Sequence, residues 1–486
     1  MRAADSRALP PRRIAALALV AALAVAWAIP GPVAALVARQ EPILLGRYAV
    51  GHFAGLAIAS AVVGLAAALL WSRRSLAESI ALTGIASLST FAGVALIAAF
   101  ARETIAPRYE ARPVASAVAD PALAARLAGR VLVRQPNFRW DVVREDLPAP
   151  GRSYPKRVAG QPSRPVVLTT DDRGLRNPPR SGRYDVVVAG DSFTEGSMVS
   201  DDETWWARLA QTTGRRIYNT AVSGLSIREY LNNWAAFGLD SGATTLVVML
   251  YEGNDWKPLS PARPATASRP LPLRAGLFDF AFGDSPLRWR AQLALVQLLA
   301  PIGADRPPPP SPGLAWMPVE VAAGGVTQHY AFEPKHMMRL DWDPAAFEAA
   351  PEWTTNEAVL RELVAIARER GVRVVIAYAP SKPHVVLPLV RDRVTAEQLH
   401  AFALFRDRAD PLPPADAFQE RLFQRLDAQE QVLGRWCAAQ GVEFLPLTAS
   451  LRDAIGRGIP VYFTYDPHWT EQGHAVVAAH IARLFH

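Results

Sequence analysis

The chain has 486 residues, of which 50% are apolar, and it carries a formal net charge of +7. Its length exceeds that of one ordinary domain, and its apolar share exceeds what a soluble core needs. A single cysteine, Cys437, excludes an internal disulfide. Much of the positive charge flanks apolar segments near the N-terminus, so we do not interpret it as a nucleic-acid-binding surface and expect no nucleic-acid partner.

The first hundred residues contain three long apolar runs. They cover residues 14–38, 48–71 and 79–100. Each has at least about twenty residues, the length of a helix that crosses a bilayer core. The first run alone resembles a signal peptide, but two further runs follow it. We therefore predict a retained region of three transmembrane helices over residues 1–101, in contact with the lipid bilayer.

The arginines that flank these runs set the predicted orientation. With the N-terminus in the cytoplasm, six flanking arginines lie inside and five outside, a margin of one. The inner ones are Arg2, Arg7, Arg12, Arg13, Arg73 and Arg74, and the outer ones are Arg39, Arg47, Arg102, Arg108 and Arg112. An odd number of spans then places the rest of the chain outside the cytoplasm.

Residues 102–165 are rich in proline and arginine and have no sustained periodicity, which is typical of a linker and an irregular lead-in. An ordered domain is expected over residues 166–486. Its strands are predicted at 185–190, 216–221, 244–251, 373–379 and 442–447, and its helices at about 203–213, 226–237, 353–370, 418–440 and 471–484. This alternation predicts an α/β fold with a parallel sheet, right-handed crossovers and helices on both faces.

Residues 257–350 interrupt the alternation with many prolines and single aromatic residues. We predict that they form an insertion over the site, with one helix near 286–300. Neither a P-loop nor a dinucleotide-binding fingerprint is present, and no cofactor is expected.

The strongest candidate for chemistry is the stretch that follows the first predicted strand of the sheet. Val186-Val187-Val188-Ala189 has the length and composition of a buried strand, and Gly190-Asp191-Ser192 marks a sharp turn after it. A serine at the tip of a strand is exposed as a nucleophile, with backbone N–H groups around it. An isolated tripeptide of this kind is more typical of a turn in which the serine caps a helix. Further motifs are therefore needed to choose between a nucleophilic serine and a serine that only caps a helix.

Three such motifs fall where the sheet requires catalytic parts. Gly224 follows the second strand, Asn254 follows the third, and Asp466-Pro467-His468 precedes the last helix. Taken together, in order and at successive strand ends, they supply two oxyanion donors and an acid–base pair for a serine nucleophile.

These blocks resemble those of the SGNH (GDSL-like) hydrolase superfamily over residues 184–486. The resemblance rests on Gly190-Asp191-Ser192, Gly224, Gly253-Asn254-Asp255 and the Asp466/His468 pair. Residues 172–177 are similar to a segment upstream of the first block in membrane-attached bacterial members. The family implies a flavodoxin-like three-layer fold and a serine mechanism for esters, especially sugar O-acyl groups. Only Pro467 separates Asp466 from His468, and this Asp-x-His-Trp form resembles proteins of alginate and related exopolysaccharide O-acetylation.

The resemblance assigns a role to each residue. It implies that Ser192 attacks an acyl carbonyl, that His468 takes and returns the proton, and that Asp466 orients the imidazole. The N–H groups of Ser192 and Gly224 and the amide of Asn254 are expected to hold the oxyanion.

Other polar residues near these motifs are given structural roles. Asp191 is expected to brace the turn rather than react. His474 is expected to pack or cap within a helix. A metal site built from Asp466, His468 and His474 would leave the asparagine and glycine blocks without a role, so no metal is expected.

Three residues are candidates for substrate binding. Trp469, beside the base, and Trp256 are candidates to line a sugar-binding cleft, and Lys382, after the fourth strand, to meet an anionic glycan. A solvated loop is an equal alternative for Lys382. Trp205 and Trp206 lie at helical positions and are at least as well explained as core.

Three classes of function follow. The first is an enzyme of the bacterial inner membrane that moves or removes O-acyl groups, mostly acetyl, on a periplasmic glycan. A membrane-bound acyl-exporting partner would then supply the acyl group, because activated acyl donors are cytoplasmic. The second is a lipid or small-ester hydrolase, and the third a non-catalytic glycan-binding subunit of an export machine. The complete set of Ser192, Asn254, Asp466 and His468 argues against the third.

Overall fold

The computed structural model of the chain describes residues 10–28, 50–71, 109–144, 146, 160–162, 164–257, 317–332, 337, 340–403 and 412–485. They fall into two units. The first contains α1 (Pro11–Ala28) and α3 (Val50–Trp71), which contact each other. Within the described residues, no helix has both the length and the apolar character that crossing a membrane requires. The predicted span at 79–100 and part of the first lie outside the described residues, so the three-span region stays a prediction.

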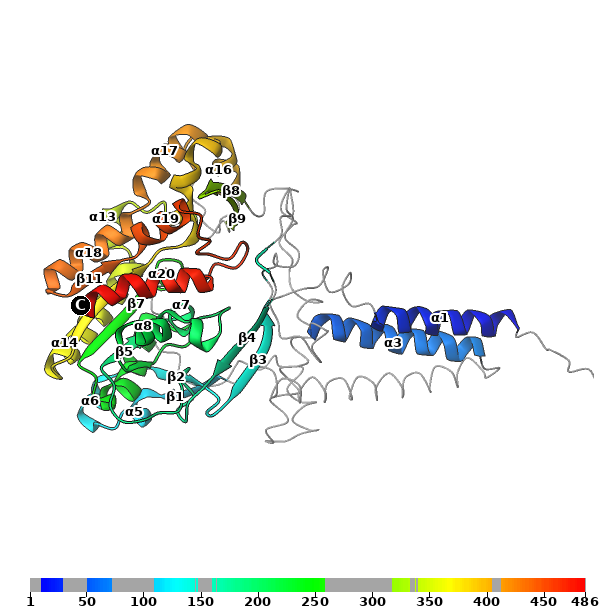
Figure 1. Ribbon diagram of the computed structural model, residues 1–486, viewed down its shortest axis with the longest axis horizontal. Helices are drawn as coiled ribbons and strands as arrows, with labels where there is room; N and C mark the ends of the chain where they lie inside the picture. Colours follow the sequence, from blue (N-terminus) through cyan, green and yellow to red (C-terminus); the bar gives the residue numbers. More distant parts are fainter. Residues whose placement is uncertain are drawn as a thin grey trace, which may run out of the picture. The chain divides into compact units, whose positions relative to one another are not determined.

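The second unit is built on a five-stranded sheet (Figure 1). Its order is β11 (Glu443–Pro446), β10 (Arg373–Ala379), β7 (Thr245–Tyr251), β5 (Val186–Ala189) and β6 (Ile217–Asn219). All neighbouring strands are parallel. The five predicted strands and the predicted parallel α/β sheet are therefore confirmed.

Side chains of the sheet alternate between two apolar cores, one on each face. On β5, Val186 and Val188 belong to one core, and Val187 and Ala189 belong to the other. All four are buried because helices cover both faces. The strand is therefore a continuous apolar run in the sequence.

Helices supply the two outer layers (Figure 1). The first core takes side chains from α8 (Trp205–Thr213), α15 (Lys382–Val386), α16 (Ala396–Ala403), α17 (Ala415–Arg425), α19 (Thr448–Gly456) and α20 (Glu471–Ala482). The second takes them from α9 (Ile227–Asn233), α13 (Pro344–Ala349), α14 (Pro351–Glu369) and α18 (Ala428–Gln440). The unit also contains short 3₁₀ helices: η1 (Asp201–Glu203), η3 (Leu239–Ser241), η4 (Leu387–Arg393) and η5 (Arg483–Phe485). A π-helical segment, η2 (Trp234–Gly238), follows α9 directly.

The single helix predicted at 418–440 is in fact two helices, α17 and α18. The break falls at Asp427, which lies outside both helices. The Oδ1 atom of Asp427 lies 2.8 Å from Nε2 of the buried His384. The apolar periodicity continues across this break, so the sequence pattern alone did not show it.

The lead-in, residues 109–144 with residue 146, differs from the predicted irregular linker. It forms β1 (Tyr109–Pro113), α5 (Val114–Ala117), α6 (Pro121–Arg126), β2 (Arg130–Arg134) and β3 (Arg139–Arg144). β1 pairs with β2, and β3 pairs with β4 (Arg164–Thr169), both antiparallel. Val131 and Val133 are fully buried in the second core. Elements this short carry too few residues to show a period, so the ordered domain begins near residue 109 and not at 166.

The described part of the predicted insertion contains an antiparallel hairpin, β8 (Met317–Ala323) and β9 (Val326–Phe332). Val319, Val321, Tyr330 and Phe332 belong to the first core, so the hairpin is part of the domain's packing. The helix predicted near 286–300 lies outside the described residues.

Candidate active site

The nucleophile turn connects β5 to the short helix α7 (Ser192–Glu195). A side chain at Gly190 would place its Cβ 2.3 Å from Thr194 Oγ1 and 3.2 Å from the Met249 carbonyl oxygen, so only glycine fits there. The carboxylate of Asp191 caps α7 by accepting a hydrogen bond from the Phe193 N–H at 2.9 Å. Ser192 is thus fixed as the first residue of a helix at the carboxyl end of a central strand.

The three predicted catalytic residues form a hydrogen-bonded chain. Ser192 Oγ lies 2.7 Å from His468 Nε2, and His468 Nδ1 lies 2.6 Å from Asp466 Oδ1. Asp466 Oδ1 also accepts the backbone N–H of His468 at 2.9 Å, which fixes the carboxylate against the imidazole. Asp466 is 6% exposed and His468 18% exposed. This geometry suits removal of the serine proton by His468 and stabilisation of the resulting imidazolium by Asp466.

The charges around His468 favour its protonated form. Burial lowers the pKa of His468, but the charge and the hydrogen bond of Asp466 outweigh burial, and the net pKa is raised above its ordinary value. The charge of Asp191 raises the pKa of His468 further, and the charge of Arg144 lowers it. Asp191 itself has a raised pKa because it is buried, although the Phe193 N–H, the charge of His468 and a contact from the Asn254 side chain lower it.

Two backbone N–H groups are available for an oxyanion. In the described part of the chain, neither the Ser192 N–H nor the Gly224 N–H donates a hydrogen bond. Gly224 is exposed and has a φ of 82°, and a Cβ there would meet nothing within 4 Å. Glycine is therefore required at this position by backbone conformation, not by space.

Asn254 follows β7 at the same end of the sheet and is half-buried. Its side chain contacts the Asp191 carboxylate, which flanks the nucleophile. Its Oδ1 is buried and has no hydrogen-bond partner among the described residues. The residue therefore lies beside the nucleophile turn, as an oxyanion donor must.

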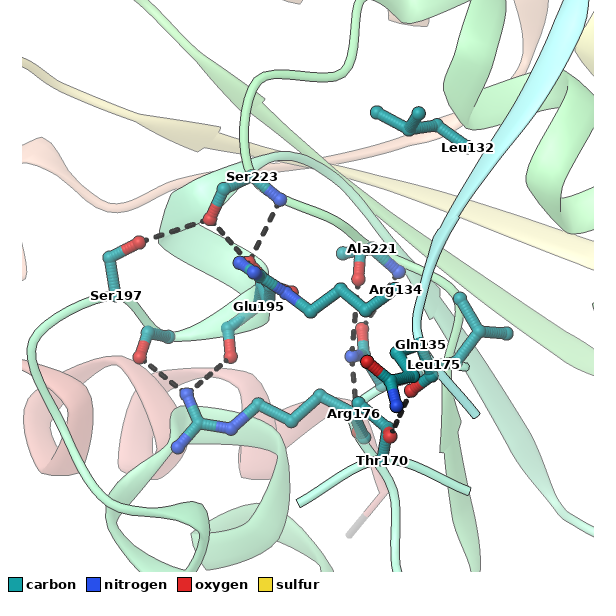
Figure 2. Close-up of polar contacts among 12 residues, drawn as sticks. Leu132, Arg134, Gln135, Thr170, Leu175, Arg176, Glu195, Ser197, Ala221 and Ser223 are labelled. Carbon is teal, nitrogen blue, oxygen red and sulfur yellow. Dashed lines mark hydrogen bonds and ion pairs between the residues drawn. The ribbon is translucent and has the colours of Figure 1, made fainter. Parts of the chain in front are cut away.

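A buried ion pair joins the nucleophile helix to β2 of the lead-in, and no sequence motif indicated it (Figure 2). Glu195, the last residue of α7, receives hydrogen bonds from Arg134 Nε at 2.5 Å and Arg134 Nη2 at 2.7 Å. Glu195 Oε2 also accepts the Ser223 N–H at 2.9 Å and the Ser223 hydroxyl. Burial raises the pKa of Glu195, but Arg134 outweighs this and the net pKa is lowered. Glu195 is thus an anion that ties Ser192's helix to the residue before Gly224.

The segment at 172–177 has a structural role in the same region. Arg176 is buried, and its Nη1 donates to the carbonyls of Glu195 at 2.9 Å and Gly196 at 2.5 Å (Figure 2). Asn177 accepts the Asn219 N–H at 2.8 Å and donates to the Asn219 carbonyl at 2.9 Å. These contacts brace the end of α7 and the strand β6 that precedes the glycine loop.

The three predicted substrate-binding side chains are all buried, which corrects that prediction. Trp469 is fully buried, with its ring edge-on to Phe193. Trp256 is 3% exposed and packs against Phe347 and Trp353. Their large rings fill the core, so neither lines an open cleft.

Lys382 is also buried, and neither the predicted glycan contact nor the solvated loop applies. Its Nζ donates to the carbonyl of Thr464 at 2.9 Å and contacts that of Ala331 at 3.4 Å. The Ala331 N–H donates to the same Thr464 carbonyl at 2.8 Å. Lys382 and the β9 strand therefore support the catalytic loop, residues 464–468.

The remaining candidates have the structural roles that were expected. Trp205 and Trp206 are core residues. His474 is buried and its Nδ1 accepts the Trp205 N–H at 3.1 Å, at the start of α8. Burial lowers the pKa of His474 well below its ordinary value, so it is neutral. Among the described residues, no three His, Cys, Asp or Glu side chains are grouped so as to hold a metal ion.

A parallel α/β sheet with a serine–histidine–aspartate triad at its strand ends defines a serine hydrolase. Comparison with known families makes this more specific. The GDSL-like Lipase/Acylhydrolase family matches residues 188–476, more than half of the chain. The chain therefore belongs to this family, whose members act on esters.

The solved structures that match the chain have low sequence identity to it and low TM-scores. They include an extracellular lipase from Streptomyces rimosus (13% identity, TM-score 0.29, 61% of this chain and 99% of that one). A GDSL-like lipase from Bacteroides thetaiotaomicron has 9% identity and a TM-score of 0.26, over 62% of this chain and 87% of that one. A salicylyl-acyltransferase of a tetracycline biosynthetic pathway has 11% identity and a TM-score of 0.25, over 72% and 74%. No curated protein matches the chain.

Proposed function

We propose that this protein is a membrane-anchored enzyme that transfers acyl groups, chiefly acetyl, to hydroxyl groups of a glycan outside the cytoplasm. The observation that carries the acyl-enzyme chemistry of this proposal is the hydrogen-bonded triad of Ser192, His468 and Asp466. Hydrolysis of small esters is then a slow side reaction. The competing function is an esterase for lipids or small esters, which would use the same residues.

The reaction has two halves. Ser192 Oγ attacks the acyl carbonyl while its proton passes to His468 Nε2, and the oxyanion receives hydrogen bonds from the N–H groups of Ser192 and Gly224. The donor's leaving oxygen takes the proton from His468, which leaves an acyl-serine. In the second half His468 removes a proton from the acceptor hydroxyl, the acceptor attacks the acyl-serine, and Ser192 regains its proton.

Whether water or a sugar is the acceptor depends on which one lies in attack geometry at the acyl-serine. The spacing of Asp466, His468 and Trp469 supports a glycan acceptor, because it resembles the form found in exopolysaccharide O-acetylation proteins.

The apolar runs at 14–38, 48–71 and 79–100 support membrane anchoring, with the catalytic unit in the periplasm and a membrane-bound acyl-exporting partner as donor. A reporter that is active only outside the cytoplasm, fused after His486, is expected to work. Activity of a cytoplasm-only reporter at the same position would contradict the periplasmic location and the extracytoplasmic glycan.

The transfer reaction is tested with a chromogenic acetyl ester, with and without neutral and anionic oligosaccharides. Transfer predicts that the sugar gains the mass of an acetyl group and that free acetate falls short of the ester consumed. If free acetate accounts for all turnover at saturating oligosaccharide, and acetylated sugars lose acetyl groups readily, the protein is an esterase.

A further inference from the structure

A buried aspartate of the lead-in holds the loop that carries the catalytic aspartate. Asp146 is 3% exposed. Its Oδ2 accepts the Thr464 N–H at 2.7 Å, and its Oδ1 accepts the N–H groups of Tyr465 at 2.8 Å and Asp466 at 3.1 Å. A fourth N–H, from Gln161, reaches Oδ2 at 2.8 Å. One side chain thus satisfies three successive N–H groups of the catalytic loop.

This loop depends on outside contacts for its shape. Residues 464–468 contain no helix or strand, and the isolated bridge between Tyr462 and Trp469 closes the loop at its base. Lys382 and the β9 strand hold the carbonyl of the peptide that joins Thr464 to Tyr465, and Asp146 accepts the N–H of the same peptide. Asp146 also accepts the N–H groups of the peptides on either side. Successive N–H groups that converge on one anion form a rigid nest. The position of the Asp466 carboxylate beside His468 is therefore set by these contacts.

We propose that Asp146 is a positioning residue for the catalytic triad. It does not touch the reacting atoms, and it acts by fixing the backbone of Asp466. Asp146 lies outside the family match at residues 188–476, so the lead-in supplies a part of this active site that the shared family segment does not contain. The inference concerns triad geometry and does not rest on a glycan acceptor.

The test is Asp146→Asn in the full chain, assayed by hydrolysis of a chromogenic acetyl ester. The amide keeps one acceptor but turns an N–H₂ group toward the donors that Oδ2 now satisfies, which displaces the loop. We expect kcat to fall about 10- to 100-fold with little change in KM, because a misplaced catalytic group costs about this much. We also expect the acid limb of the pH profile to move to lower pH. This limb reports the pKa of His468, which burial and Arg144 lower and which Asp466 and Asp191 raise, so a weaker contact with Asp466 lowers this pKa.

Asp341→Asn is the matched control. Asp341 is also a buried carboxylate, bound by Arg421 at 2.6 Å and 2.9 Å, and it contacts no triad residue. The Asp341→Asn substitution is expected to lower thermal stability, while kcat per folded molecule and the pH profile stay unchanged. If Asp146→Asn behaves like this control, Asp146 is a stability residue only and the proposal is wrong.

If Asp146→Asn does not fold, Gly160→Ala tests whether Asp146 positions the catalytic triad. A Cβ at Gly160 would lie 1.8 Å from the Asp146 carbonyl oxygen, so the substitution pushes Asp146 away without removing its carboxylate. A lower kcat with a shifted acid limb supports the proposal, and a wild-type profile overturns it.

Discussion

Arg134→Met isolates the buried ion pair between the lead-in and the nucleophile helix. The Arg134 and Glu195 side chains are 7% and 2% exposed, so the substitution leaves a carboxylate buried without its counter-ion. Removing one partner of such a pair costs about 3–5 kcal/mol of folding free energy. The kcat should fall as well, since Glu195 also holds Ser223, the residue before Gly224.

Arg126→Met is the matched control on the same lead-in. Arg126 pairs with Glu369 at 2.7 Å, but the two side chains are 46% and 49% exposed, so its loss should cost far less folding free energy than the loss of Arg134. Urea unfolding followed by tryptophan fluorescence measures both variants. The double variant Arg134→Met/Glu195→Gln should be more stable than Arg134→Met alone, because no unpaired charge remains. The reasoning is refuted if Arg134→Met costs no more than Arg126→Met.

The other predictions concern the triad, the oxyanion and a second buried charge. Asn254→Ala should keep residual ester turnover, with a loss of about 2.7–4 kcal/mol of transition-state stabilisation; undiminished kcat would remove Asn254 from the oxyanion site. Asp466→Asn should lower both kcat and the pH of the acid limb, because Asp466 raises the pKa of His468; an unmoved limb would contradict this. Burial lowers the pKa of His384, but Glu252 and Asp427 raise it to about 10. His384 should therefore stabilise the fold fully below its unfolded pKa of about 6.5, and this contribution should be lost as pH rises through about 10. Urea unfolding at successive pH values checks this, and His384→Gln should show a weaker alkaline decline.

The sheet and the triad could be predicted from the sequence because their signals are local. Strand β5 is buried on both faces, and a strand of this kind must be a continuous apolar run. Ser192, Gly224 and Asn254 follow strands whose ends meet at one edge of the sheet, so their order alone brings them together. The Asp466/His468 pair lies between α19 and α20, and its short spacing before the last helix is a local signal as well.

The supporting residues could not be predicted, because their partners are distant in the chain. Arg134, Asp146 and Lys382 are charged, and a charged residue in a sequence is normally exposed. Only the folded chain shows that each is buried against a carboxylate, backbone N–H groups or carbonyls. Trp256 and Trp469 were misassigned for a related reason, since a tryptophan beside a motif is equally suited to a cleft and to a core.

The lead-in was missed because its elements are short. Strand β2 has only five residues, and its three apolar ones stand between Arg130 and Arg134. A fragment of residues 160–486 lacks this strand and Asp146, so it is expected to show much lower ester turnover than the full chain.

The central claim is that Ser192 is the nucleophile, and covalent labelling of the full chain with a serine-directed fluorophosphonate tests it most directly. We expect one adduct, at Ser192, that is lost in Ser192→Ala. Ser450 provides a control, because its Oγ lies 2.6 Å from His480 Nδ1 in a second serine–histidine pair, and Ser450→Ala should label like wild type. Labelling that persists in Ser192→Ala, or that is lost in Ser450→Ala, would contradict the assignment.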